Sequence, residues 1–158
     1  MRSAAALLAL LSFVVNAGDY NLSVTRKGSN LYKVDGNDIF IHTRYCYEYV
    51  YYADVVLRMS GHTGTITFLE EKESCDVKSV YARIDLSPGK YNVSVSREDD
   101  NWYRIDGTDQ YIKTSICLGL ALGEDSLLKM DSGSFGTVYF LDDRKNCQVE
   151  GIYERKRL

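Results

Sequence analysis

The sequence predicts an all-β protein made of two tandem copies of one antiparallel β meander, each stapled by a disulfide. Three observations predict this class: short segments in which apolar and polar residues alternate, a sequence that repeats itself at a constant spacing, and four cysteines that fall as one pair per repeat. The 158-residue chain also contains a single proline and few strong helical patterns. This length allows one ordinary domain or two very small ones.

Residues 1–17 (MRSAAALLALLSFVVNA) have the features of a cleaved signal peptide: a positive charge at Arg2, an apolar run, and small residues before Gly18. The run is shorter than the about 20 residues needed to cross a bilayer. We therefore expect a secreted, extracellular protein without membrane insertion. Cleavage removes Arg2 and makes the chain more acidic than the net charge of -3 of the full sequence. An acidic chain disfavours nucleic acid and anionic lipid as partners.

The internal repeat is visible in several blocks. YNLSVTR at 20–26 recurs as YNVSVSR at 91–97, and YKVDGND at 32–38 recurs as YRIDGTD at 103–109. After one inserted residue, GTITFL at 64–69 matches GTVYFL at 136–141. Agreement at a nearly constant offset predicts an internal duplication. The resulting division is a first repeat at 18–81, a linker at 82–90, a second repeat at 91–153 and a solvated basic tail at 154–158. The two repeats form either separate units or one pseudo-twofold body.

The alternation in the first block of each repeat has the period of two expected of a half-buried strand. Asp-Gly pairs at 35–36 and 106–107 lie between apolar runs and predict hairpin turns. The short apolar runs at 54–59 and 125–130 fit either a strand or a helix.

Four cysteines allow three disulfide connectivities. Duplication of a self-sufficient unit favours pairing within each repeat, Cys46 with Cys75 and Cys117 with Cys147. Disulfides are preferred to zinc because export leads to an oxidising compartment and neither repeat offers repeated histidines. We expect no metal and no cofactor. Each bridge closes a loop of roughly 30 residues and contributes about 3.5 kcal/mol in the chain-entropy model, which a repeat of this size needs because its core is small.

Tyrosines recur at alternate positions of the segment YCYEYVYY at 45–52. In a strand, Tyr45, Tyr47, Tyr49 and Tyr51 would all leave one face. Buried tyrosine hydroxyls need partners, whereas exposed rings suit sugar stacking and protein hot spots. The row is therefore either a ligand-contacting face or ordinary packing at a half-wet surface or between the repeats.

The second repeat carries aliphatic residues where the first carries the tyrosine row. We expect these residues in a core or a permanent interface, so the tyrosine row predicts a single site. Trp102, whose counterpart is Leu31, is a second candidate for stacking on a ligand. The aliphatic counterparts are Ile116, Leu118, Leu120 and Leu122.

The other candidate residues give weaker indications of a functional site. The carboxylates of Asp35, Asp38, Asp106 and Asp109 could serve acid–base catalysis or calcium binding, but Asp-Gly is also what a turn requires and the remaining EF-hand spacing is missing. Neither histidine has a nearby cysteine or serine in a known nucleophile context, and we expect His42 and His62 to be solvent-exposed. Asn21 and Asn92 head equivalent N-glycosylation sequons.

The leading hypothesis is a secreted tandem-repeat binding protein whose tyrosine row contacts a carbohydrate or an extracellular protein, without catalytic residues. One alternative is a small secreted hydrolase that uses the repeated Asp-Gly-x-Asp carboxylates. Another is a structural protein whose tyrosines meet a further subunit in an oligomer.

Overall fold

The computed structural model describes residues 18–132 and 135–158, so the expected signal peptide lies outside the described residues. The described residues form twelve strands and no helix. The all-β prediction is confirmed, and the ambiguous runs at 54–59 and 125–130 are strands. The elements are β1 (Gly18–Gly28), β2 (Leu31–Val34), β3 (Ile39–Arg44), β4 (Ala53–Ser60), β5 (Thr63–Phe68), β6 (Glu73–Ile84), β7 (Gly89–Asp99), β8 (Trp102–Ile105), β9 (Gln110–Thr114), β10 (Glu124–Met130), β11 (Gly136–Phe140) and β12 (Lys145–Lys156).

The first six strands close into an antiparallel barrel. β1 pairs with β2 and β4, β3 pairs with β2 and β6, and β5 pairs with β4 and β6. The order departs from a simple meander at one step, because β4 pairs with β1 and not with β3. β3 and β4 therefore lie on opposite sides of the ring, and the segment that joins them has to cross an end of the barrel.

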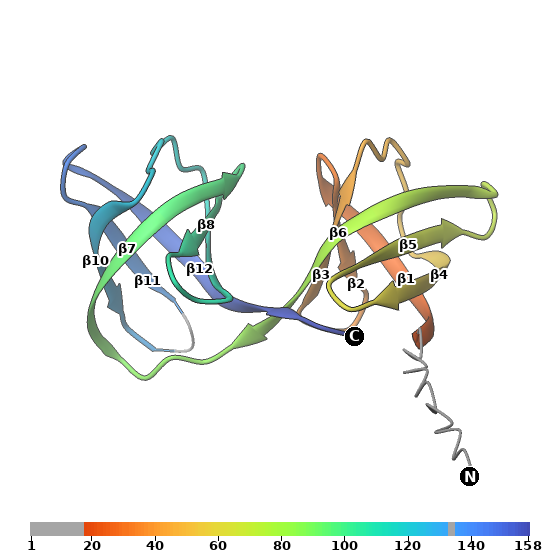
Figure 1. Ribbon diagram of the computed structural model, residues 1–158, viewed down its shortest axis with the longest axis horizontal. Coiled ribbons are helices and arrows are strands. Elements are labelled where there is room, and N and C mark those ends of the chain that lie inside the picture. Colours follow the sequence, from red (N-terminus) through yellow and green to blue (C-terminus); the bar gives the residue numbers. More distant parts are fainter. Residues whose placement is uncertain (1–17, 133–134) are drawn as a thin grey trace, which may run out of the picture.

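Strands β7 to β12 form a second barrel with equivalent pairings. Figure 1 shows the two barrels side by side. Each has its own buried core, which includes Val24, Ile41 and Phe68 in the first barrel and Val95, Ile112 and Phe140 in the second. The duplication itself is an inference from the sequence comparison and stays a prediction.

Two long strands join the barrels. β6 and β12 each leave their own barrel and pair with one another, from Val80 opposite Lys156 to Ile84 opposite Ile152 (Figure 1). Beyond this pairing, the backbone of Leu158 exchanges two hydrogen bonds with Gly61, at 2.8 and 2.9 Å. Residues 154–158, which the sequence predicted to be a solvated tail, are therefore tied to the first barrel. The charged residues of this segment suggested a solvated tail, but the backbone of residues 154–156 belongs to strand β12 and is paired with β6.

An aromatic cluster also spans the two barrels. Phe40 and Tyr81 come from the first barrel, whereas Trp102, Tyr111 and Tyr153 come from the second. The Trp102 ring stacks on Tyr81 at 4.8 Å between centroids and meets Tyr153 at 5.1 Å. Its side chain is only 2% exposed, so it is not available to stack on a ligand at the surface. Trp102 is therefore not part of the exposed surface formed by the tyrosine row, and it lines a cavity between the barrels instead.

The predicted disulfide pairing is confirmed. Cys46 is bonded to Cys75 and Cys117 to Cys147, with Cα–Cα distances of 5.5 and 5.6 Å. In both cases the first cysteine lies in the segment that crosses the end of the barrel and the second lies in the last strand of that barrel. Disulfides of this kind are typical of proteins in oxidising environments.

Because Trp102 fills the junction between the barrels, we expect Trp102→Ala to lower the free energy of unfolding by about 3–5 kcal/mol, the usual range for removing a large buried aromatic ring. Denaturant titration of the full chain measures this change. Leu69→Ala is the control, because this leucine is 51% exposed and its replacement should change stability by less than about 0.5 kcal/mol. A comparably small loss for Trp102→Ala would show that the cluster does not hold the barrels together.

Candidate functional site

Residues 45–52 join β3 to β4 and cross the end of the first barrel that lies uppermost in Figure 1. The strand predicted here is wrong, because a segment that crosses a barrel end has no neighbouring strand with which to pair. The expected alternation is nevertheless present: Cys46 and Val50 are buried at 1% and 9% exposure. The outward residues are 71–85% exposed, and we call them the tyrosine comb: Tyr45, Tyr47, Tyr49 and Tyr51.

The comb segment is held from its inward side. The disulfide ties Cys46 to Cys75 in β6, and hydrogen bonds fix the backbone on either side of it. Because these contacts bind the backbone or inward side chains, the tyrosine rings are left outside. The bonds run from the Cys46 N–H to Asn30 Oδ1 (2.8 Å), from the Tyr32 hydroxyl to the Glu48 carbonyl oxygen (2.9 Å), and from the Arg26 N–H to the Val50 carbonyl oxygen (3.0 Å).

The equivalent segment of the second barrel has the same anchors and a different surface. The Cys117 N–H donates to Asn101 Oδ1 at 2.8 Å, and the Tyr103 hydroxyl donates to the Gly119 carbonyl oxygen at 2.7 Å. The expectation that the aliphatic row lies in a core is therefore wrong, since the anchored backbone turns these side chains outward as well; the alternative of a permanent interface stays a prediction. They are 74–91% exposed, and we call them the aliphatic comb: Ile116, Leu118, Leu120 and Leu122.

Arg26 adds a charge to the tyrosine comb. Its guanidinium carbon lies 3.8 Å from the centroid of the Tyr49 ring, a cation–π contact. The equivalent Arg97 forms an ion pair with Asp100 at 2.8 Å. Serine replaces that aspartate at position 29, and among the described residues no carboxylate forms an ion pair with Arg26. Sequence reasoning missed Arg26, although the Ser29/Asp100 difference between the repeats could have indicated it.

Tyr52 extends the aromatic surface at a conformational cost. Its φ is 52°, in the left-handed region, where the second barrel has Gly123 at 62°. A non-glycine residue in this region costs about 1–2 kcal/mol. The Tyr52 ring packs edge-on against Tyr51 at 4.4 Å. Sequence reasoning missed Tyr52 because the alternation excludes it.

Two hollows flank the outer part of the comb. One, of about 540 Å³, lies between Tyr49, Tyr51 and Arg26. The other, of about 460 Å³, lies between the same tyrosines and the turn that contains Glu70 and Glu71. The rings of Tyr49 and Tyr51 therefore stand between a basic and an acidic rim.

The predicted Asp-Gly turns are confirmed. Gly36 and Gly107 have φ values of 78° and 76°. Asp35 accepts hydrogen bonds from two hydroxyls of β1, and Asp106 accepts the equivalent pair from β7. Asp109 forms an ion pair with Arg155 at 2.6 Å. These carboxylates thus fasten turns and strands to one another. Within residues 18–132 and 135–158, no group of three or more His, Cys, Asp or Glu side chains could hold a metal ion.

The equivalent asparagines of the two sequons, Asn21 and Asn92, are both exposed on the first strand of their barrels. Glycosylation at these positions stays a prediction.

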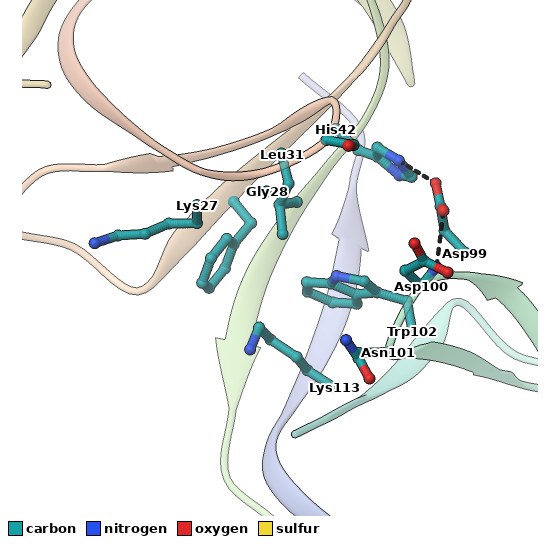
Figure 2. A pocket seen from close by; sticks show the side chains of 11 residues that line it. Lys27, Gly28, Leu31, His42, Asp99, Asp100, Asn101, Trp102 and Lys113 are labelled. Atoms are coloured by element: carbon teal, nitrogen blue, oxygen red, sulfur yellow. Dashed lines mark hydrogen bonds and ion pairs between the residues drawn. The ribbon is translucent and has the colours of Figure 1, made fainter. Parts of the chain in front are cut away.

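A cavity of about 410 Å³ lies between the barrels, as Figure 2 shows from close by. His42 borders it and is 3% exposed, so the prediction of a solvent-exposed histidine is wrong for this residue. Its Nε2 lies 2.6 Å from a carboxylate oxygen of Asp99 in the second barrel. Lys27 and Lys113 line it together with Asp99 and Asp100. Because the lining carries both signs of charge, it favours neither an anionic nor a cationic ligand.

Neither a protein-family model, nor a curated protein, nor a solved structure matches this chain. No helix long and apolar enough to span a membrane occurs among the residues that the structure describes.

Tyr32→Phe removes the hydroxyl that holds the Glu48 carbonyl, at a cost of about 1 kcal/mol. We expect hydrogen exchange in residues 45–51 to accelerate about fivefold, with no change in residues 116–122. Tyr103→Phe is the matched control and should give the reverse pattern. Equal exchange in both segments for both variants would contradict the anchoring of each comb by its own tyrosine.

Burial lowers the pKa of the His42 imidazole below its ordinary value of about 6.5, and the adjacent Lys78 adds to this, whereas Asp99 and Glu98 oppose it. As the pH falls through about 6.5, the His42 imidazole therefore takes up a proton more readily in the unfolded chain than in the folded chain. We expect the free energy of unfolding to fall as the pH decreases below about 6.5. His42→Gln should weaken this dependence and His62→Gln should retain it, as measured by denaturant titration from pH 7 to pH 5. Identical profiles for the parent and His42→Gln would contradict the assignment.

Proposed function

We propose that this chain is a secreted binding protein that contacts another extracellular protein through the tyrosine comb. One observation carries the proposal: four tyrosine rings, each 71–85% exposed, stand on a backbone that a disulfide and hydrogen bonds fix from the inside. A fixed backbone lowers the entropy cost of ordering the contact surface on binding. The two disulfides and the expected signal peptide support an extracellular location.

The residue types favour a protein partner. Tyrosine and arginine are enriched among the residues that dominate protein–protein binding energy, and Arg26 lies against Tyr49 without a carboxylate in ion-pair contact among the described residues. A projecting row of rings suits insertion into depressions of another surface. Small ligands, in contrast, usually bind in concave sites that cover most of their surface. Tyr52 supports the same proposal. Glycine would adopt its φ of 52° without strain, so a tyrosine at this position indicates that the aromatic ring itself is used.

Carbohydrate is the second candidate. The hollows on either side of Tyr49 and Tyr51 could receive sugar rings that stack on the tyrosine faces. We do not propose a hydrolase, because the hydroxyl contacts of Asp35 and Asp106 assign these carboxylates to turns.

The test uses the full secreted chain with its disulfides formed, immobilised and exposed to two probes. One probe is the secreted protein fraction of the source, before and after enzymatic deglycosylation, and the other is a glycan array. We expect a protein that survives deglycosylation as a ligand and that binds at least tenfold less to the Tyr47→Ala/Tyr49→Ala variant. Captured proteins are identified by mass spectrometry.

The control is Tyr20→Ala/Tyr139→Ala, which removes two tyrosines that are each 38% exposed outside the comb. It should bind like the parent, and circular dichroism should show all three proteins folded. Glycan binding that the comb variant alone loses would support the second candidate. Equal binding by the comb variant and the parent would overturn the assignment of the site.

A further inference from the structure

We propose that the aliphatic comb inserts into the hydrocarbon layer of a zwitterionic phospholipid bilayer, which revises the sequence-based expectation of no membrane insertion. It consists of Ile116, Leu118, Leu120 and Leu122, with exposed fractions of 91%, 77%, 74% and 89%. This surface belongs to the second barrel and is distinct from the tyrosine comb. It adds a lipid-binding activity to the proposed function and does not depend on it.

The composition of the comb favours lipid over protein. Between residues 116 and 122 every outward side chain is aliphatic and every intervening residue is buried. Leucine and isoleucine are among the residues most favoured in bilayer hydrocarbon. Leucine is under-represented among protein hot spots, where tyrosine and arginine prevail. The aliphatic comb thus has the composition of a lipid contact, whereas the tyrosine comb has that of a protein contact.

Three backbone groups of the segment that carries the comb have partners inside the barrel. The Cys117 N–H is bonded to Asn101, the Gly119 carbonyl to Tyr103, and the Ala121 carbonyl to the Arg97 N–H at 2.8 Å. Polar backbone groups that lack partners are costly in hydrocarbon. The inward anchors therefore lower the cost of bringing this loop to a bilayer.

The size of the comb argues against a second copy of the chain as its occupant. Burial of a leucine or isoleucine side chain removes about 60–120 Å² of apolar surface from water, so four remove roughly 250–500 Å². A specific protein interface of standard size buries about 800 Å² on each partner. Two combs that meet would bury too little surface for a stable dimer. Insertion into a bilayer does not require a minimum buried area of this kind.

The position of the tyrosine comb fits the same orientation. The connection from β3 to β4 and the connection from β9 to β10 both lie at the upper end of the molecule in Figure 1, one above each barrel. Tyrosine is enriched at the boundary between bilayer and water. A molecule that approaches a bilayer with this end would place aliphatic side chains in the hydrocarbon and tyrosine rings at the headgroups.

Charge selects the type of lipid. The formal net charge of the chain is -3, and Asp100 neutralises Arg97 beside the aliphatic comb. Binding to anionic membranes depends on an excess of clustered lysines and arginines. In the turn bonded to Glu124, next to this comb, Arg144 and Lys145 are balanced by Asp142 and Asp143. Zwitterionic lipid therefore suits the surface better.

The test is sedimentation of the full disulfide-bonded chain with phosphatidylcholine vesicles, and with vesicles that also contain phosphatidylserine. We expect the chain to bind the zwitterionic vesicles, and binding to persist at high salt. Leu118→Ser/Leu120→Ser should lower the partition coefficient about tenfold or more. The fold should survive, because both side chains are exposed.

The matched control is Leu69→Ser/Leu141→Ser, which removes two leucines that are 51% and 56% exposed elsewhere on the surface. It should bind vesicles like the parent. Absence of vesicle binding, binding that needs phosphatidylserine and disappears at high salt, or equal binding by the comb variant would each overturn the proposal. Sedimentation velocity without lipid supplies one more decisive result, since a dimer that Leu118→Ser/Leu120→Ser dissociates would make the comb a subunit interface.

Discussion

The fixation of one extended segment across the end of each barrel is the constraint on which the surface of this protein depends. A disulfide and hydrogen bonds to Asn30 Oδ1 and from the Tyr32 hydroxyl hold the first segment. A disulfide and the equivalent bonds with Asn101 and Tyr103 hold the second. Alternate residues of each segment close the barrel end. Because the backbone is extended and fixed, the intervening side chains face solvent whatever their chemistry, and one scaffold presents tyrosines in one barrel and aliphatic residues in the other.

The two combs have a fixed placement relative to one another, because the barrels are joined. The pairing of β6 with β12 and the aromatic cluster around Trp102 join the barrels so that both combs lie at the same end (Figure 1). Tyrosine rings that lie among the headgroups of a bilayer are covered, so the protein contact and the lipid contact are separate proposals.

Local features of the sequence predicted much of the fold. Alternation gave the strands, Asp-Gly gave the turns, and the repeat gave the disulfide pairs, because each depends on residues close in sequence or on the comparison of the two copies. Barrel closure could not be predicted, since it depends on β4 pairing with the distant β1. The equivalent pairing of β10 with β7 in the second barrel turns Leu118 outward, and the docking of the barrels buries Trp102 and His42. Residue type alone assigned all three to the wrong environment.

The central claim is that the anchored backbone, not the character of the side chains, decides which residues face solvent. Nitration of tyrosines in the native monomer, mapped by mass spectrometry, tests it most directly. The account predicts rapid modification of Tyr45, Tyr47, Tyr49 and Tyr51, and modification of Tyr32 and Tyr103 only after unfolding. Protection of the four comb tyrosines in the monomer, or early nitration of Tyr32, would contradict it.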